Sequence, residues 1–365
     1  MRPSAPARVL ILSDRECAPT LSRCGTYEFE DLARSVDAVD LVPANGHAGR
    51  LGRRIERLIP GALPMPPKLD RGEPYDLLFA SFHSLPDLAR LHPLGRILGL
   101  ARHTVINIDE LWGTDLLRHS GDLAMLRRFD RVFTPCAGGL EVLRNAIGRP
   151  CEYLAPSVDA LRFAPRDPAL RRTIDIHLMG RRRPALHQAL REAAEKTDRF
   201  YLFDAGQFNV PIPNYVEHRL RLSDLVQRTR FFVVDVANSD KPEKTGNQDE
   251  FGPRYVEGAA GGAILIGRAP RTPTFESEFW PGAVHPIEPD SAEIARVLDD
   301  LDSYPEEADR IRRTNVAQVM RRHDGVYRWE QILRAVGLEP LPALTARKQQ
   351  LDRLAASIES EDENE

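Results

Sequence analysis

The stretch DEFGPRYVEGAAGGAILIG, residues 249–267, decides the fold of the second half of the chain. Phe-Gly-Pro at 251–253 is typical of a turn that begins a helix, because proline at the first helical position needs no N–H partner. Paired glycines then end the helix, and 263–266 is expected to form a buried strand. Asp249 and Glu257 stand eight positions apart around the helix start. Carboxylates accept hydrogen bonds from adjacent hydroxyls, so a polyol is a suitable ligand for this pair.

The same alternation of short apolar strands with helices runs along the rest of the chain. Its 365 residues exceed one typical core, which favours two domains. Strands that alternate with helices predict α/β domains with parallel sheets and helices on both faces. Strands are expected at 9–13, 38–43, 75–81, 104–108, 131–134, 151–154, 174–179, 200–203, 231–236 and 283–287.

The proline-rich stretch after Ala155 interrupts this alternation and is typical of a connection between domains. We therefore expect a first domain at 1–155, a linker at 156–170 and a second domain at 171–340. The tail, 341–365, is predicted to be a charged helix that fades into a disordered acidic end. Within the first domain, 47–59 is expected to be a basic helix and 60–74 a surface loop.

Composition excludes several classes of function. The net charge of −4 gives no general attraction to nucleic acid or to anionic membranes. There is no apolar run of signal-peptide or membrane-spanning length, so we expect a cytoplasmic protein without a transmembrane segment. The four cysteines show no metal-type spacing, which makes a zinc site an unfavoured interpretation.

Basic residues in the second half are candidates for binding an anion. Arg181 follows the strand at 174–179 and precedes a helix, the place where a doubly wound domain holds a phosphate. Lys241 and Lys244 lie on a long polar loop, where a solvated lysine pair is an equally good interpretation. Arg254 is in the first turn of the helix at 253, where the helix dipole also favours an anion.

Polar candidates in the first half follow its strands. Glu28 and Glu30 come after the first strand, and Asp109 and Glu110 come after the fourth. Because the carboxyl ends of parallel strands meet at one edge, these acids are expected to face the ligand-binding crevice. Trp112 is a candidate for stacking on a sugar, although a tryptophan packed at a domain edge is the commoner case.

Three motifs resemble those of one enzyme family. Asp249-x-Phe251-Gly252-x4-Glu257 resembles the E-x7-E signature of retaining GT-B glycosyltransferases, with Asp249 in the place of the first glutamate. The stretch 156–163 is similar to the interdomain P-x-x-V-D-x-x-x-F segment of that family, one residue shorter after the proline. The stretch 323–338 is similar to spore-maturation-type glycosyltransferase-like members. The resemblance covers roughly 151–338, and the first half matches in its strand–helix alternation alone.

The resemblance implies a GT-B fold, in which two Rossmann-like domains face each other and the second binds a nucleoside-diphosphate-sugar. Glu257 would hold the ribose hydroxyls and Asp249 the hydroxyls of the transferred sugar. Arg181 would contact phosphate, with Gly252 also on the donor side. The usual lysine partner of that arginine is absent from 184–188, and the candidates to replace it are Lys241, Lys244 and Arg254.

The family signature also implies retention of configuration. Basic side chains and a helix N-terminus can stabilise the charge that develops on the leaving nucleoside diphosphate, so no metal cofactor is expected. There is no Asp-x-Asp of the metal-dependent type after an early strand. The family's glycine-rich loop after the first strand is replaced by Cys-Ala-Pro-Thr at 17–20, so the acceptor side departs from its pattern. The acceptor is left open as a glycan, a lipid or a small molecule.

Two other functions fit the same sequence. A sugar-nucleotide epimerase or hydrolase on this fold would bind the same donor and need acid–base groups beside the sugar. A non-catalytic nucleotide-sugar-binding protein would explain both Asp249 in place of glutamate and the missing lysine.

Overall fold

The computed structural model describes residues 6–16, 18–44, 73–91, 94–118, 120–167, 170–180, 182–204 and 210–360. The expected helix at 47–59 lies outside the described residues, as do residues 60–72 of the expected loop. The chain divides into two compact units. Unit 1 comprises 1–155, 211–215 and 328–346, and unit 2 comprises 156–210, 216–327 and 347–365.

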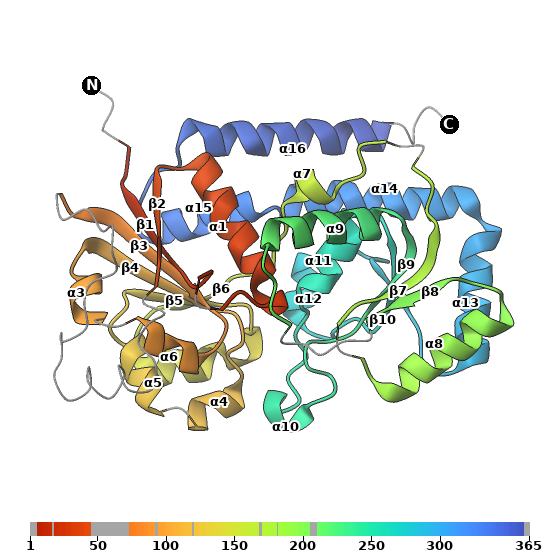
Figure 1. Ribbon diagram of the computed structural model, residues 1–365, viewed down its shortest axis with the longest axis horizontal. Coiled ribbons are helices and arrows are strands. Elements are labelled where there is room, and N and C mark those ends of the chain that lie inside the picture. Colours follow the sequence, from red (N-terminus) through yellow and green to blue (C-terminus); the bar gives the residue numbers. More distant parts are fainter. Residues whose placement is uncertain are drawn as a thin grey trace. The chain divides into compact units, whose positions relative to one another are not determined.

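Unit 1 is built on a parallel sheet with the strand order β2-β1-β3-β4-β5-β6 (Figure 1). Its strands are β1 (Val9–Ser13), β2 (Val39–Pro43), β3 (Tyr75–Phe82), β4 (Ala101–Ile108), β5 (Arg131–Thr134) and β6 (Cys151–Tyr153). Its helices are η1 (Leu21–Arg23), α1 (Cys24–Val36), η2 (Leu85–Arg90), α3 (Leu94–Leu98), α4 (Gly113–Arg118), α5 (Ser120–Leu126), η3 (Ala137–Gly139) and α6 (Leu140–Ile147).

Apolar side chains on the two faces of this sheet pack against different helices. One face joins a buried cluster that includes Leu78 of β3 and Leu143 of α6. On the opposite face Phe79 of β3 makes edge contacts with Phe29 of α1 at 6.0 Å and with Trp329 at 5.7 Å between ring centroids. Because successive strand residues alternate between faces, neighbours in β3 serve two separate layers. The resulting burial of both faces explains why β1 reads as an uninterrupted apolar run.

Unit 2 contains a second parallel sheet with the order β11-β10-β9-β7-β8. Its strands are β7 (Ile174–Leu178), β8 (Tyr201–Phe203), β9 (Thr229–Val234), β10 (Ile264–Gly267) and β11 (Val284–Pro286). Its helices, together with those that continue to the end of the chain, are α7 (Ala160–Phe163), α8 (Pro184–Lys196), α9 (Tyr215–Gln227), α10 (Pro242–Thr245), α11 (Pro253–Ala260), α12 (Pro273–Glu278), α13 (Ser291–Ser303), α14 (Pro305–Arg322), α15 (Gly325–Ala335) and α16 (Pro342–Ser360).

The strand order gives each sheet a point at which the chain reverses its direction of winding. In unit 1 the chain runs from β1 to β2 on one side and then to β3 on the other. In unit 2 it runs from β7 to β8 and then to β9 on the opposite side of β7. Ligands of doubly wound sheets bind outside the carboxyl ends of the strands at such reversals. The predicted α/β class with parallel sheets is confirmed in both units.

Two segments from later in the sequence pack with unit 1. Residues 211–215 and 328–346 belong to it by their contacts, whereas the sequence placed them in the second domain and the tail. Trp329 Nε1 donates a hydrogen bond to Asp37 Oδ2 at 2.9 Å, which helps to fix the second segment. The tail forms α16, which runs to Ser360 and buries Leu344 and Leu351, and the expected disordered end at 361–365 lies outside the described residues.

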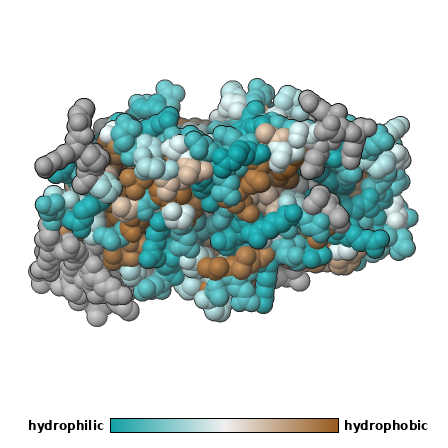
Figure 2. Space-filling model, turned by 90° about the horizontal axis from the view of Figure 1, so that it is seen from above, coloured by the Kyte–Doolittle hydropathy of each residue, from teal (hydrophilic) through white to brown (hydrophobic). Residues whose placement is uncertain are grey.

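The surface is mixed in character. On the face shown in Figure 2, hydrophilic residues surround separate hydrophobic patches. Three exposed apolar side chains, Val216, Leu220 and Leu225, lie on α9. No helix in the described part of the chain is long and apolar enough to cross a lipid bilayer.

Candidate functional site

Helix α11 carries Glu257 into the interior of unit 2. Gly252 is its N-cap residue, with an extended backbone (φ −99°, ψ 178°), and Pro253 is its first residue. This is the turn and helix start predicted from Phe-Gly-Pro. Glu257, one turn further on, has 2% of its surface exposed. The carboxylate therefore lies inside the unit and not on a solvated face.

Both carboxylate oxygens of Glu257 are in ion pairs. Arg219 of α9 donates from Nη1 to Oε1, and Arg254 donates from Nη1 to Oε2. Burial alone would raise the pKa of Glu257, but the guanidinium groups of Arg254 and Arg219 outweigh burial and lower the pKa to about 2. Glu257 is therefore charged at neutral pH and fixes both arginines.

A glycine next to Glu257 allows this depth of burial. A Cβ added to Gly258 would lie 2.6 Å from Leu265 Cδ2 and 2.7 Å from Phe232 Cδ1. Both distances are shorter than real Cβ contacts, so α11 approaches β9 and β10 more closely than an alanine would permit. Gly258, inside the helix that the sequence predicted, is thus a position of close packing between α11 and the sheet.

Asp249, the other predicted carboxylate, lies in a more open position. Its Oδ1 is 3.3 Å from Nη2 of Arg268, which follows β10, and 39% of its side chain is exposed. Arg268 Nε is also 3.3 Å from Oδ1 of Asp235, which follows β9. Arg183 Nε donates to Asp235 Oδ2 at 2.7 Å. Alternating acids and arginines therefore line the carboxyl ends of three strands.

The turn after β7 lies beside this group. Gly180 has φ +87°, and its N–H donates to Asp204 Oδ2 at 2.8 Å. A Cβ on Gly180 would lie 4.0 Å from Arg254 Nε, which places Arg254 next to the turn. Arg182 donates to the Asp204 carbonyl oxygen, and its guanidinium lies 5.4 Å from the ring centroid of Phe203. Arg181, the predicted phosphate contact, lies outside the described residues.

The two predicted lysines lie on the loop that joins β9 to α11. Lys241 is the N-cap residue of the short helix α10, and Lys244 lies in its last turn. Both side chains are half-buried. Both lysines therefore lie on the loop on which the sequence analysis placed them. The short helix α10 within this loop was not predicted.

The family of the second half of the chain follows from comparison with known proteins. Residues 162–334, which include all the unit 2 candidates named above, match the sequence model of a family described as "Glycosyl transferase-like". No curated protein matches the chain in sequence. This match assigns residues 162–334, within the second half of the chain, to a glycosyl transferase-like family.

Solved structures that share this fold include three proteins of low sequence identity. Anabaena HepE in complex with UDP and glucose is 14% identical, with a TM-score of 0.55, over 90% of this chain and 99% of HepE. Sucrose-phosphate synthase from Thermosynechococcus elongatus is 13% identical, with a TM-score of 0.51, over 90% and 98%. An alpha-glucosyltransferase in complex with UDP and a 13-mer DNA is 12% identical, with a TM-score of 0.53, over 91% and 100%. These likenesses establish the GT-B fold.

Two side chains next to Glu257 and Arg254 were missed by the sequence analysis because α9 was not predicted. Arg219 of α9 holds Glu257, and His218 lies beside it. Burial lowers the pKa of His218, and the nearby charges of Arg219 and Arg254 lower it further. The sequence pattern that could have predicted α9 is a helical stripe, because its buried residues Arg219, Leu222 and Val226 recur at spacings of three and four.

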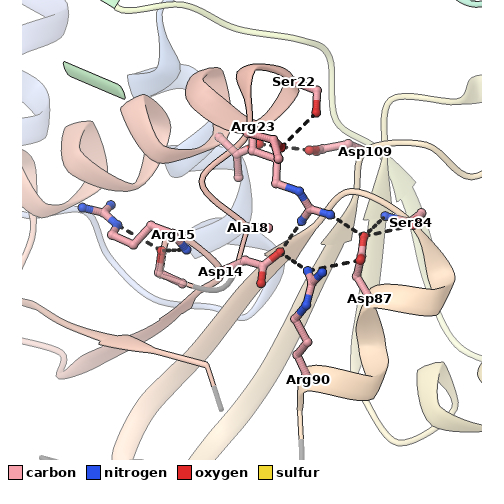
Figure 3. Close-up of polar contacts among 12 residues, drawn as sticks. Asp14, Arg15, Ala18, Ser22, Arg23, Ser84, Asp87, Arg90 and Asp109 are labelled. Carbon is pink, nitrogen blue, oxygen red and sulfur yellow. Dashed lines mark hydrogen bonds and ion pairs between the residues drawn. The ribbon is translucent and has the colours of Figure 1, made fainter. Parts of the chain in front are cut away.

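Unit 1 of this GT-B protein has its own charged cluster, at the carboxyl ends of β1 and β3 (Figure 3). Asp14 Oδ2 accepts hydrogen bonds from Arg23 and from Arg90, the latter at 2.5 Å. Arg23 Nη2 also donates to Asp87 Oδ2 at 2.8 Å. Burial raises the pKa of Asp14 to about 6 despite the opposing charges of Arg23 and Arg90. The loop that replaces the family's glycine-rich turn is thus held by paired charges.

The candidate residues that the sequence analysis named in the first half of the chain differ in burial. Glu30 is fully buried and accepts a hydrogen bond from Arg15 Nη2 at 2.8 Å. Asp109 accepts from Thr26 Oγ1 at 3.0 Å, and burial raises its pKa. Trp112 has 1% of its surface exposed and belongs to the core, so the suggestion that it stacks on a sugar is wrong.

Among the described residues, no group of three or more histidine, cysteine, aspartate or glutamate side chains is arranged to hold a metal ion.

Proposed function

We propose that this protein transfers a sugar from a nucleoside-diphosphate-sugar to an acceptor, and that unit 2 binds the donor. The observation that carries the proposal is the buried Glu257 carboxylate with Arg254 and Arg219 at the start of α11. This group lies where a ligand of a doubly wound sheet is expected, outside the carboxyl end of β7.

In the proposed complex, basic side chains bind the diphosphate and neutralise its negative charge. Arg254 keeps 29% of its side chain exposed while Glu257 fixes its guanidinium, so its other N–H groups are available to phosphate oxygens. The dipole of α11 adds a favourable partial positive charge at its N-terminal end. Arg181, Lys241 and Lys244 are further proposed contacts. Such fixed donors stabilise the charge that develops on the leaving nucleoside diphosphate, and the proposed step requires no metal ion.

The two carboxylates are proposed to bind hydroxyls. Each oxygen of Glu257 already accepts one hydrogen bond and has capacity for another, which we assign to the ribose. Asp249 is more exposed and is assigned to the transferred sugar, where a hydroxyl would compete with Arg268. Retention of configuration is part of the proposal and rests on the E-x7-E resemblance.

Binding of nucleoside diphosphates tests the donor site. The HepE structures contain UDP, UDP with glucose, or UDP-glucose, which makes UDP the first nucleotide to try. A ligand that binds the native state raises its unfolding temperature. We expect a thermal shift with at least one of UDP, GDP and ADP, and smaller shifts with the corresponding monophosphates. Absence of binding to any diphosphate would overturn the proposal.

Turnover separates the transferase from the alternatives. The matching nucleotide-sugar is incubated with and without a panel of glycan, lipid and small-molecule acceptors, and the donor is followed by NMR. We expect rapid consumption only with an acceptor. Isomerisation or rapid hydrolysis of the donor alone would favour an epimerase or hydrolase, and tight binding without any turnover would favour a binding protein. The cytoplasmic location expected from the sequence stays a prediction.

A further inference from the structure

A histidine that the sequence analysis did not select lies among the charged side chains around Glu257. His218 is half-buried in the first turn of α9, directly before Arg219. The charges that act on its imidazole ring belong to Arg219, Arg254, Glu257 and Asp204. All of these residues are in unit 2. The ring is therefore part of the group that we propose to bind the donor.

The same ring is close to the turn that follows β7. Asp204 accepts a hydrogen bond from the Gly180 N–H at 2.8 Å, and a Cβ on Gly180 would lie 4.0 Å from Arg254 Nε. Two of the charged side chains that act on His218 therefore meet at this turn. Because a doubly wound sheet binds its ligand outside the carboxyl ends of its strands, His218 lies at the expected ligand edge of unit 2.

The surroundings of the imidazole decide which of its nitrogens carries the proton. Nδ1 is enclosed and has no hydrogen-bond partner among the described residues, whereas Nε2 is not enclosed. A buried N–H without an acceptor is costlier than an unshared lone pair, so the proton belongs on Nε2.

The ring is also kept neutral. Burial lowers the pKa of His218, and the charges of Arg219 and Arg254 lower it further. The positive end of the α9 dipole acts in the same direction, because His218 lies in the first turn of that helix. At neutral pH the accessible side of this ring therefore presents a neutral N–H donor.

We propose that His218 is a further binding residue of the donor site, whose Nε2–H donates a hydrogen bond to a phosphate oxygen of the nucleoside diphosphate. Arg254, with 29% of its side chain exposed, binds the same anion from α11. A charged imidazole would repel the two arginines that hold Glu257, whereas a neutral one adds a donor without that repulsion. The identity of the ligand rests on the proposed function, and the position of the ring proton does not.

Nitrogen NMR of the imidazole rings tests the state of His218 in the unaltered protein. Its signals are those missing from the spectrum of His218→Gln. We expect a neutral ring with the proton on Nε2 at neutral pH, and a shift of these signals when UDP or inorganic pyrophosphate binds. A proton on Nδ1, or signals that bound UDP leaves unmoved, would overturn the proposal. A response to uridine without one to pyrophosphate would place the contact at the nucleoside and refute the phosphate role.

Calorimetry with UDP tests the contribution of the hydrogen bond. Glutamine carries its amide N–H near the position of Nε2, whereas asparagine carries it near Nδ1. We expect His218→Ala and His218→Asn to bind UDP about tenfold more weakly, and His218→Gln to stay within about threefold of the wild type. Unfolding temperatures show that each variant is folded.

His285→Ala is the matched control. His285 of β11 is also half-buried, has an enclosed ring nitrogen without a partner in the described part of the chain, and has its pKa lowered by burial. The charge that acts on it is that of Glu307, outside the donor group. We expect this variant to bind UDP like the wild type.

The outcomes separate this inference from the proposed function. Equal UDP affinity of the wild type and His218→Ala would overturn the inference and leave the proposed function intact. An equal loss in His218→Gln and His218→Ala would show that the ring acts by packing and would refute the hydrogen bond. If the wild type binds no nucleoside diphosphate, the proposed function fails and the phosphate contact fails with it.

Discussion

Arg254 and Glu257 lie three residues apart on α11, and Arg254 Nη1 donates a hydrogen bond to Glu257 Oε2. The carboxylate is 3% exposed and the guanidinium 29% exposed. One end of this pair is therefore fixed in the interior, while the other remains accessible beside the turn after β7. An arginine held in this way loses little side-chain entropy when it binds an anion, because its orientation is already set.

Arg254→Met is predicted to weaken the binding of UDP about tenfold or more, since a hydrogen bond to a charged group contributes about 1.5–3 kcal/mol. Calorimetry at low and at high salt measures the effect, which is expected to be larger at low salt. Arg296→Met is the control, because Arg296 is an exposed residue of α13. Unchanged UDP affinity in Arg254→Met would remove this residue from the proposed site.

Stability is predicted to fall in acid partly because of Glu257. Its folded-state pKa is about 2, below the ordinary value of 4.5. Between these values the unfolded chain binds the proton and the folded protein does not, so stability is lost as pH falls through this window. The contribution is on the order of 3 kcal/mol.

Urea unfolding of the wild type and of Glu257→Gln from pH 7 to pH 2 measures this contribution. The variant is predicted to be less stable at pH 7 by about 3–5 kcal/mol, because it leaves the buried guanidinium of Arg219 and the partly exposed guanidinium of Arg254 without their carboxylate. The difference from the wild type should shrink toward pH 2. Glu288→Gln, at an exposed position, is the control and should follow the wild type. A difference that is independent of pH would contradict the assigned pKa.

Gly258→Ala is predicted to destabilise unit 2 by about 1–3 kcal/mol, the usual cost of overpacking a filled core. The added methyl group would collide with Leu265 and Phe232, at 2.6 and 2.7 Å. Gly25→Ala is the matched control, since an added Cβ meets nothing within 4 Å at that helical position. Thermal unfolding of both variants measures the contrast. Equal stability of the two would show that α11 can move away from the sheet without cost.

Asp249→Asn is predicted to separate binding of the sugar from binding of the nucleotide. Asp249 is assigned to the sugar, so the variant should bind UDP like the wild type and bind the complete nucleotide-sugar several-fold more weakly, by about 1 kcal/mol. Competition binding with both ligands gives the two affinities. A parallel loss for UDP would place Asp249 at the nucleotide instead.

Local sequence determined the elements that carry the site. Gly252 and Pro253 dictate the helix start, because an N-cap glycine and a proline at the first position suit the unsatisfied end of a helix. The short apolar stretch after Gly262 was predicted to form a buried strand, and β10 occupies this position. Glu257 was therefore assigned correctly to a helix beside the sheet. The roles given to Asp249 and Glu257 came from the resemblance and stay predictions.

The partners of these residues were decided by tertiary structure. Arg219 is 38 residues before Glu257 and Arg268 is 19 after Asp249, and no spacing rule links positions so far apart. The same applies to Tyr215, whose contacts with Arg15 and Asp31 span 200 and 184 residues. By itself the sequence determined the α/β class, the two sheets and the acidic pair, because strand and helix patterns are local. Only the folded chain decided which arginines neutralise those acids, because a buried charge is stabilised by whichever opposite charge the packing of distant elements brings beside it.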